Sequence, residues 1–367
     1  MTSPLVARML ANINSCADEE RRAVQVAELA CYWARTGDFE QAEKLRMDLR
    51  RAFGDGRSAP VSILVMCLES LLLYFKELSP KARDWMLRAN LLSKTFQEHR
   101  LNALTSAWMA HIDFNENRYE AMAANLLTCA RHLASDDGGA EGRASLVLGD
   151  AFLFAGDTSS SKLWYANAQR CATKFGDHAG IGAMTYNRAA LRVSTARFRN
   201  LRHAVDKGEA SLINSEVNSA INYQAAAELK SLDHLLGAAK AGALMLQQNF
   251  DEAKIEIERQ LNSASLSPES SQERLLRVDL AYINARSGIT DGLEAVVKRA
   301  QEDASQLEAD DRALLLSSAG AIAGMLGDHK RQADLTRAAV EAMDLHEAAM
   351  TALLQKISVF RDGIFRT

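Results

Sequence analysis

The chain has 367 residues, 48% of them hydrophobic and 25% charged, so it has enough apolar surface to bury a core and is not a disordered protein. Lysine and arginine number 43 against 47 for aspartate and glutamate, which leaves a net charge of −4 and no overall positive field to attract nucleic acid. Only four prolines occur, where average usage of about 5% would give roughly 18, and this scarcity favours helices over a turn-rich β protein.

The N-terminal residues lack the apolar core of about 7 to 15 residues that a signal peptide needs, and no run of about 18 apolar residues indicates a membrane span. The five cysteines are an odd number, widely spread in a chain long enough to fold without disulfides. We therefore expect a cytoplasmic protein with reduced thiols and no membrane association.

In chain order, helical segments alternate with short breaks that often carry glycine or asparagine. Glycine adopts the left-handed conformation that ends a helix without steric cost, and an aspartate just after it can cap the next helix. The breaks lie near Gly37, at Leu78 to Pro80, near Asn117 and Gly156, at Thr195 to Phe198, and near Gln248, Gly288 and Gly327.

Successive breaks lie about 40 residues apart, which is typical of a solenoid in which each helix pair is too small to bury its own apolar face. Small residues such as Gly149 suit positions where two helices approach closely. The sequence therefore predicts an all-α solenoid of antiparallel helix pairs. The alternative is an ordinary helical bundle in which the spacing is a coincidence.

One step is longer, at about 52 residues, and it suggests a division of the chain. Residues 1–212 are predicted to form N-terminal helical repeats, about five units, and 233–367 to form C-terminal repeats, about three units with a C-terminal cap. Residues 213–232 would be an extra or lengthened helix where the chain could bend, or simply a longer pair without functional meaning. A second candidate hinge is the loop-like segment 135–140.

The last unit of a solenoid has no neighbour to cover its apolar side. Val359, Phe360, Ile364 and Phe365 lie close to the C-terminus. These side chains would either fold back as a cap or remain available as a docking element.

The segment from Leu148 to Ala168 resembles the tetratricopeptide repeat. A period near 40 is more similar to the longer-repeat solenoids of bacterial transcription activators of the maltose-regulator kind and of peptide-responsive regulators. That resemblance implies a right-handed superhelix whose inner face is lined by the first helix of each pair and binds peptides or proteins, without catalytic activity. The matching residues are Leu148, Gly149, Phe152, Gly156, Asp157, Tyr165 and Ala168.

Carrying the inner-face positions of that repeat across gives a mostly apolar and aromatic lining, suited to an amphipathic helix or a hydrophobic segment. The lysines and asparagines that grip a terminal carboxylate in better-known members are replaced by Cys31, His111 and Asp150, so that clamp is not expected here. The alternative is that the aromatic residues form core between repeats. The predicted partner-binding face is Tyr74, Phe75, His111, Phe114, Asn115, Asp150, Phe154, Tyr186 and Tyr282, and other positions on the same face include Cys31, Arg35, Cys67, Leu71 and Leu146.

A basic cluster near one repeat junction could contact an acidic protein or a phosphate, or could be a solvated helix face balanced by neighbouring acids. An acidic run from Glu302 to Asp311 could meet it in a second copy of the chain, which would make a homo-oligomer. The predicted anionic-partner patch is Arg188, Arg192, Arg197, Arg199 and Arg202.

Motifs for chemistry are weak. Gly180-Ile181-Gly182 lacks the third glycine of a nucleotide-binding loop, and the eight histidines form no His-Glu-x-x-His pair. Cys129 and His132 are a single pair without further local ligands. No catalytic residue, cofactor or metal is therefore predicted.

The leading interpretation is a non-catalytic scaffold or adaptor that binds a protein or peptide through its concave face. The alternative is a ligand-responsive sensor that controls a partner enzyme or a nucleic-acid transaction. Direct nucleic-acid binding is not expected, because we expect no room outside the repeats for a helix-turn-helix domain. A third interpretation, an enzyme using a cleft between helices, would need converging ionisable groups, and the face offers chiefly His111 and Asp150.

Overall fold

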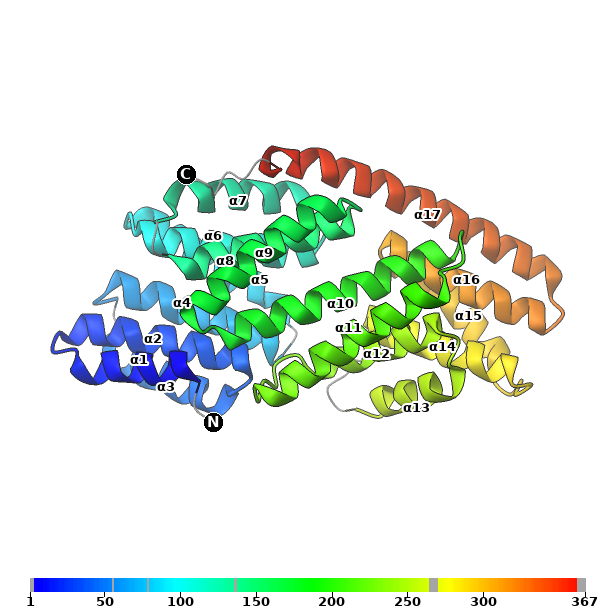
Figure 1. The fold of residues 1–367 in the computed structure, drawn as a ribbon, viewed down its shortest axis with the longest axis horizontal. Coiled ribbons are helices and arrows are strands. Elements are labelled where there is room, and N and C mark those ends of the chain that lie inside the picture. The colour runs from blue at the N-terminus through cyan, green and yellow to red at the C-terminus, as the bar shows by residue number, and fades with distance from the viewer. Residues whose placement is uncertain (1–2, 55, 78, 135–136, 264–269, 362–367) are drawn as a thin grey trace. The chain divides into compact units, whose positions relative to one another are not determined.

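A computed structural model describes residues 3–54, 56–77, 79–134, 137–263 and 270–361. Within these ranges the chain is all-α, without a strand, as the composition predicts (Figure 1). The α-helices are α1 (Pro4–Ser15), α2 (Glu19–Thr36), α3 (Phe39–Phe53), α4 (Ala59–Phe75), α5 (Lys81–Thr95), α6 (His99–Asn115), α7 (Tyr119–His132), α8 (Gly138–Phe154), α9 (Thr158–Phe175), α10 (His178–Asn200), α11 (Lys207–Ala226), α12 (Asp233–Leu246), α13 (Phe250–Leu261), α14 (Ser271–Arg286), α15 (Leu293–Asp303), α16 (Ala309–Met325) and α17 (His329–Ile357), with short 3-10 turns at Ala304–Gln306 and Ser358–Phe360.

Most predicted breaks fall between helices, for the predicted reason. Gly37 ends α2 with φ of 90°, and Gly156 has φ of 85°. The side chain of Asp157 then accepts a hydrogen bond from the backbone N–H of Ser160 and caps α9. The break predicted at Thr195 to Phe198 is wrong, because α10 continues through it to Asn200. No glycine interrupts that stretch, so nothing there relieves the strain of a left-handed residue.

Helices adjacent in sequence pack in pairs, which is consistent with a helical repeat. The helix α2 contacts α3, and the same holds for α4 with α5, α6 with α7, and α8 with α9. The first helices of these pairs also contact one another in order, α2 with α4, α4 with α6 and α6 with α8. The structure therefore has the helical array that the spacing predicts, with the first helices side by side.

The chain divides into two compact units, whose boundaries fall inside α10, α11 and α17. The first unit comprises residues 1–185, 223–232 and 353–367, and the second comprises 186–222 and 233–352. Residues 213–232 form the second half of α11 and the connection to α12, so α11 is a long helix. The predicted domain limits at 212 and 232 stay a prediction.

The first unit is more than a stack of nearest neighbours. Arg35 at the end of α2 pairs with Asp177, which precedes α10, at 2.6 Å. The backbone N–H of Lys230 donates to the carbonyl of Thr36, and the hydroxyl of Ser231 donates to that of Arg35. A simple solenoid makes no contacts across such sequence distances, so this unit departs from that architecture.

Close approach within the pairs depends on small residues. A Cβ added to Gly149 on α8 would lie 2.8 Å from the ring of Tyr165 on α9, which real side chains essentially never do. This confirms the role predicted for Gly149.

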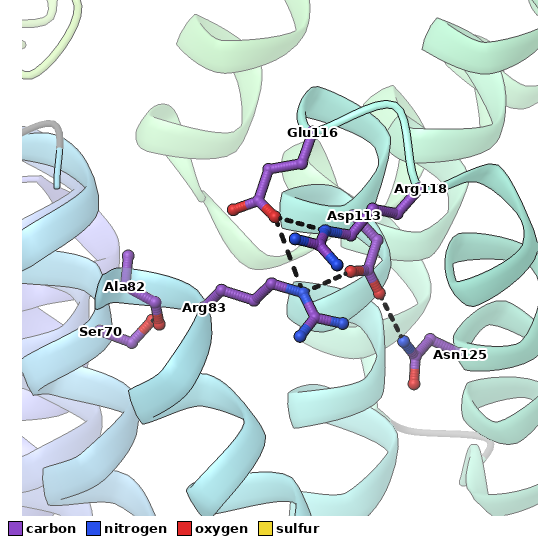
Figure 2. A network of polar contacts seen from close by, with 7 residues as sticks. All are labelled: Ser70, Ala82, Arg83, Asp113, Glu116, Arg118 and Asn125. Atoms are coloured by element: carbon purple, nitrogen blue, oxygen red, sulfur yellow. Dashed lines mark hydrogen bonds and ion pairs between the residues drawn. The ribbon is translucent and has the colours of Figure 1, made fainter. Parts of the chain in front are cut away.

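A buried polar network ties α5, α6 and α7 together in the first unit (Figure 2). The carboxylate of Asp113 is fully buried, and it accepts hydrogen bonds of 2.8 Å from Arg83 on α5 and from Asn125 on α7. Glu116 lies 2.8 Å from the guanidinium of Arg118 and 3.8 Å from that of Arg83. The network fixes the relative positions of three consecutive helices, because a buried carboxylate is stable only when its oxygens are paired.

The end of the chain is partly covered. Phe360 is fully buried and Val359 is half exposed, while Ile364 and Phe365 lie outside the described residues. In the first unit Lys356 pairs with Glu120 at 2.6 Å.

Candidate ligand cavity

The first unit contains a cavity of about 510 Å³, large enough for a small organic ligand or the end of a peptide. Its walls come from α1, α2, α4, α6, α8 and α9 and from the start of α10. Three glycines at the start of α8, Gly138, Gly139 and Gly142, contribute no side-chain bulk to it. The cavity is therefore bounded mainly by the first helices of the pairs, the face that the repeat pattern predicts.

Most of the cavity wall is apolar. It includes Leu64 and Leu71 from α4 and Leu146 from α8. Three thiols, Cys31, Cys67 and Cys171, also line it. Burial raises the pKa of Cys31 well above its usual value and that of Cys67 to about 12, so both stay protonated and are poor nucleophiles. Four of these six residues, with Leu64 and Cys171 the exceptions, stand at inner-face positions expected from the sequence.

Charged groups come from several elements of the wall, including Asp137 just before α8. At the exposed rim, Arg100 pairs with Glu28, and the guanidinium of Arg8 donates to the carbonyl of Phe175. Further inside, Arg35 pairs with Asp177. Although burial opposes it, the charge of Arg35 lowers the pKa of Asp177, so this carboxylate is ionised and neutralises Arg35.

Arg143 on α8 is different from these arginines. Its side chain is buried, with 6% of the residue exposed, and its guanidinium carbon lies 3.9 Å from the centre of the Trp108 ring. Burial, followed by the charge of Arg35, lowers the pKa of Arg143 to about 9, which still leaves it charged at neutral pH. A buried guanidinium at this distance from an aromatic face is held by a cation–π contact.

His111 on α6 lies beside the same tryptophan, with ring centres 5.5 Å apart. Its Nε2 lies 3.1 Å from the hydroxyl of Tyr74, which accepts a hydrogen bond from the amide of Asn115. When that hydroxyl donates to Nε2, the ring hydrogen of His111 is on Nδ1. Burial, with the charges of Arg143 and Arg35, lowers the pKa of His111 well below 6.5 and keeps it neutral.

The structure brings together three members of the predicted partner-binding face, Tyr74, His111 and Asn115, in one hydrogen-bonded group. The aromatic members Phe75 and Phe114 are buried in the packed interior. Phe114 contacts Phe154 edge to face, with ring centres 6.0 Å apart.

Asp150 is also buried, and accepts a hydrogen bond of 2.7 Å from Tyr165. The predicted binding role of this face remains a prediction.

Tyr186 and Tyr282 lie in the second unit. Tyr186 lines a cavity of about 340 Å³ together with Arg197 and Asp279. Tyr282 contacts Phe250, and the guanidinium of Arg286 lies 4.5 Å from the centre of the Phe250 ring.

The arginines of the predicted basic patch are paired with acidic residues of the second unit. Arg197 binds both carboxylate oxygens of Asp279, at 2.7 and 2.8 Å, and Asp279 is buried. The remaining pairs are Arg188 and Arg192 with Glu216, Arg199 with Glu209, and Arg202 with Asp344 and Glu347. These pairs lower the charge available to an anionic partner, although that role stays a prediction.

Sequence reasoning missed Arg143 and Trp108. Arg143 precedes Leu146 by three residues and Asp150 by seven, so all three share one face of α8. Extending the inner-face pattern toward the start of the helix would have found it. Nothing in the sequence shows that Trp108 packs against a charged side chain from another pair.

No protein-family model matches this sequence, and a search of curated proteins finds no significant relative. Among the described residues, no group of three or more histidine, cysteine, aspartate or glutamate side chains is arranged to hold a metal ion. In the same part of the chain, no helix combines the length and apolar composition needed to cross a membrane.

Proposed function

We propose that this chain is a non-catalytic, ligand-responsive helical-repeat protein whose first unit binds a compact apolar ligand or the apolar end of a peptide. The observation that carries the proposal is the cavity of about 510 Å³ on the first-helix face. An α-helix with its side chains is about 10 to 12 Å across, so a cavity of this size suits a small molecule or a short extended segment better than a whole helix.

Binding at this position would couple distant parts of the first unit. The ligand would contact α1, α2 and α4 on one side and α8, α9 and the start of α10 on the other. A ligand that binds only the folded state adds its binding free energy to stability, about 2.7 kcal/mol at a hundred times the dissociation constant. The change that binding causes in these helices would signal occupancy to a partner protein, as in the long-period, right-handed solenoids that the sequence resembles.

The sequence also allows a scaffold that holds a protein partner on the same face. Such a scaffold would use this surface without needing the cavity. The neutral apolar dye N-phenyl-1-naphthylamine, which fluoresces in apolar surroundings, distinguishes the two. We expect saturable binding to the wild type and its loss in Cys31→Trp, which fills the cavity. Leu71→Trp provides a second filling variant in case the first one does not fold.

The matched control is Leu91→Trp, which introduces the same residue on α5 at a position that is 52% exposed. It should bind the dye like the wild type. Non-saturable binding, or equal binding by Cys31→Trp and Leu91→Trp when both are folded, would contradict the proposal.

A further inference from the structure

The buried guanidinium of Arg143 has no acidic partner. Among the described residues no ion pair joins a carboxylate to it; its guanidinium carbon lies 3.9 Å from the centre of the Trp108 ring, and the charges of Asp177 and Asp150 act on it only from a distance. The nearby carboxylate of Asp177 is occupied by Arg35 and by the backbone N–H of Gly180. The positive charge of Arg143 in the cavity wall is therefore only partly compensated, by carboxylates that do not pair with it.

Further unpartnered donors lie around the same tryptophan. The guanidinium carbon of Arg35 lies 6.0 Å from the Trp108 ring centre, and its Nε is buried without a hydrogen-bond partner. The Nδ1 of His111 is also buried and unpartnered, and it carries a hydrogen when Nε2 accepts from Tyr74. A buried donor without a partner is costly, so the Nε of Arg35 beside the charge of Arg143 favours an anionic ligand in the cavity that both arginines line, whereas His111 lies outside that lining.

The amide of Gln224 borders Arg143 and Arg35 from another side, in a small void that all three line. Both of its polar atoms lack partners. Because a glutamine amide carries no charge, it does not compensate the charge of Arg143.

We propose that this cavity recognises an aliphatic carboxylate, with the carboxylate bound by Arg143 and the hydrocarbon chain lying against Leu64, Leu71 and Leu146. The inference rests on the proposed function and adds the chemical class of the ligand. A guanidinium binds a carboxylate through two parallel hydrogen bonds, and the low dielectric of a buried site strengthens the pair. One buried positive charge without an ion pair matches a monoanion, whereas a phosphate dianion would need a second free cation.

The arginines at the rim offer a weaker site. The side chain of Arg100 is 49% exposed and already paired with Glu28, and Arg8 is exposed and bonded to the carbonyl of Phe175. Exposed ion pairs contribute little, because water and salt screen them. Arg8→Met therefore tests the rim, and Arg170 on α9, whose side chain is 70% exposed and does not line the cavity, serves as the control position.

The test is isothermal titration of the full chain with decanoate and with decanol, which share a hydrocarbon chain and differ in the charged group. We expect the wild type to bind decanoate about 10- to 100-fold more tightly, the ratio that a hydrogen-bonded charge pair supplies. Arg143→Met should bind both compounds equally, and Arg143→Lys should keep part of the preference. Arg8→Met should keep the preference for decanoate, and Arg170→Met should behave as the wild type.

A second titration series, with trileucine and its C-terminal amide, distinguishes a peptide C-terminus from a free aliphatic acid as the source of the carboxylate. A preference for the free acid that Arg143→Met removes would identify a peptide end as the ligand, and a preference confined to decanoate would identify a free aliphatic acid. Either result supports recognition through Arg143.

Equal binding of decanoate and decanol by the wild type would overturn the inference and leave the proposed function standing, because the cavity would still accept an apolar chain. A preference that persists in Arg143→Met, or that Arg8→Met removes, would also overturn it. If neither compound nor the naphthylamine dye binds, the inference and the proposed function both fail.

Discussion

Replacing Arg143 by methionine removes a buried charge and keeps an unbranched side chain that reaches about as far as the Nε of arginine. Burial and the charge of Arg35 lower the pKa of Arg143 from 12.5 to about 9. At about 1.4 kcal/mol for each pKa unit, holding the cation in the ligand-free protein costs about 5 kcal/mol. The cation–π contact with Trp108 offsets about 2 kcal/mol of that cost.

The variant should therefore be more stable than the wild type by about 1 to 3 kcal/mol in the absence of ligand, a gain in the range found when buried charges are replaced by apolar residues. For a unit of this size, each kcal/mol raises the melting temperature by about 2 to 4 °C. Differential scanning calorimetry without ligand measures the shift. Arg170→Met on α9, where the arginine side chain is 70% exposed, is the matched control and should change stability by less than about 0.5 kcal/mol.

A residue that stabilises the fold would give the opposite sign. If Arg143→Met lowers the melting temperature by several degrees while Arg170→Met does not, Arg143 is a structural residue with a partner that compensates its charge. The reasoning from a buried charge without an ion pair would then be refuted.

Two further predictions concern the same unit. Asp113→Ala leaves Arg83 without its buried carboxylate, so the free energy of unfolding in urea should fall by about 3 kcal/mol. This is the lower end of the range for a broken buried pair, because Arg83 is partly exposed. A loss below about 1 kcal/mol would contradict this prediction. Burial and two arginines lower the pKa of His111 in the folded protein. As the pH falls below 6.5, the unfolded chain therefore takes up the proton before the folded protein does. The free energy of unfolding then falls by up to about 1.4 kcal/mol per pH unit. Between pH 7.5 and 5.5, His111→Gln should therefore lose less stability than the wild type, and equal losses would show that His111 is not the group responsible.

The helical array is predictable from sequence because its signals are local. A glycine such as Gly37 or Gly156 in the left-handed region ends a helix regardless of the surrounding fold, and the spacing of such residues gives the repeat length. The break predicted at Thr195 to Phe198 rested on spacing alone, without a residue that favours the left-handed conformation. The helix continued there.

The cavity could be predicted only in part. Cys31, Cys67 and Leu146 follow from the inner-face pattern, because helical periodicity fixes which side chains share a face. The pairing of Arg35 with Asp177 could not be predicted, since it joins residues from opposite ends of the first unit. That pairing shapes the electrostatics of the site, because it occupies a carboxylate near Arg143 and leaves Arg143 without an ion pair.

The central claim is that an apolar chain occupies the cavity of the first unit with its carboxylate on Arg143. A crystal structure with 10-bromodecanoate tests it most directly, because anomalous scattering locates the bromine and thereby fixes the direction of the chain. The account predicts the carboxylate against the guanidinium of Arg143, beside Trp108, and the bromine among the leucines of the wall. Bromine beside Trp108 with the carboxylate at the rim near Arg8 and Arg100, or a cavity that stays empty at saturating ligand, would contradict it.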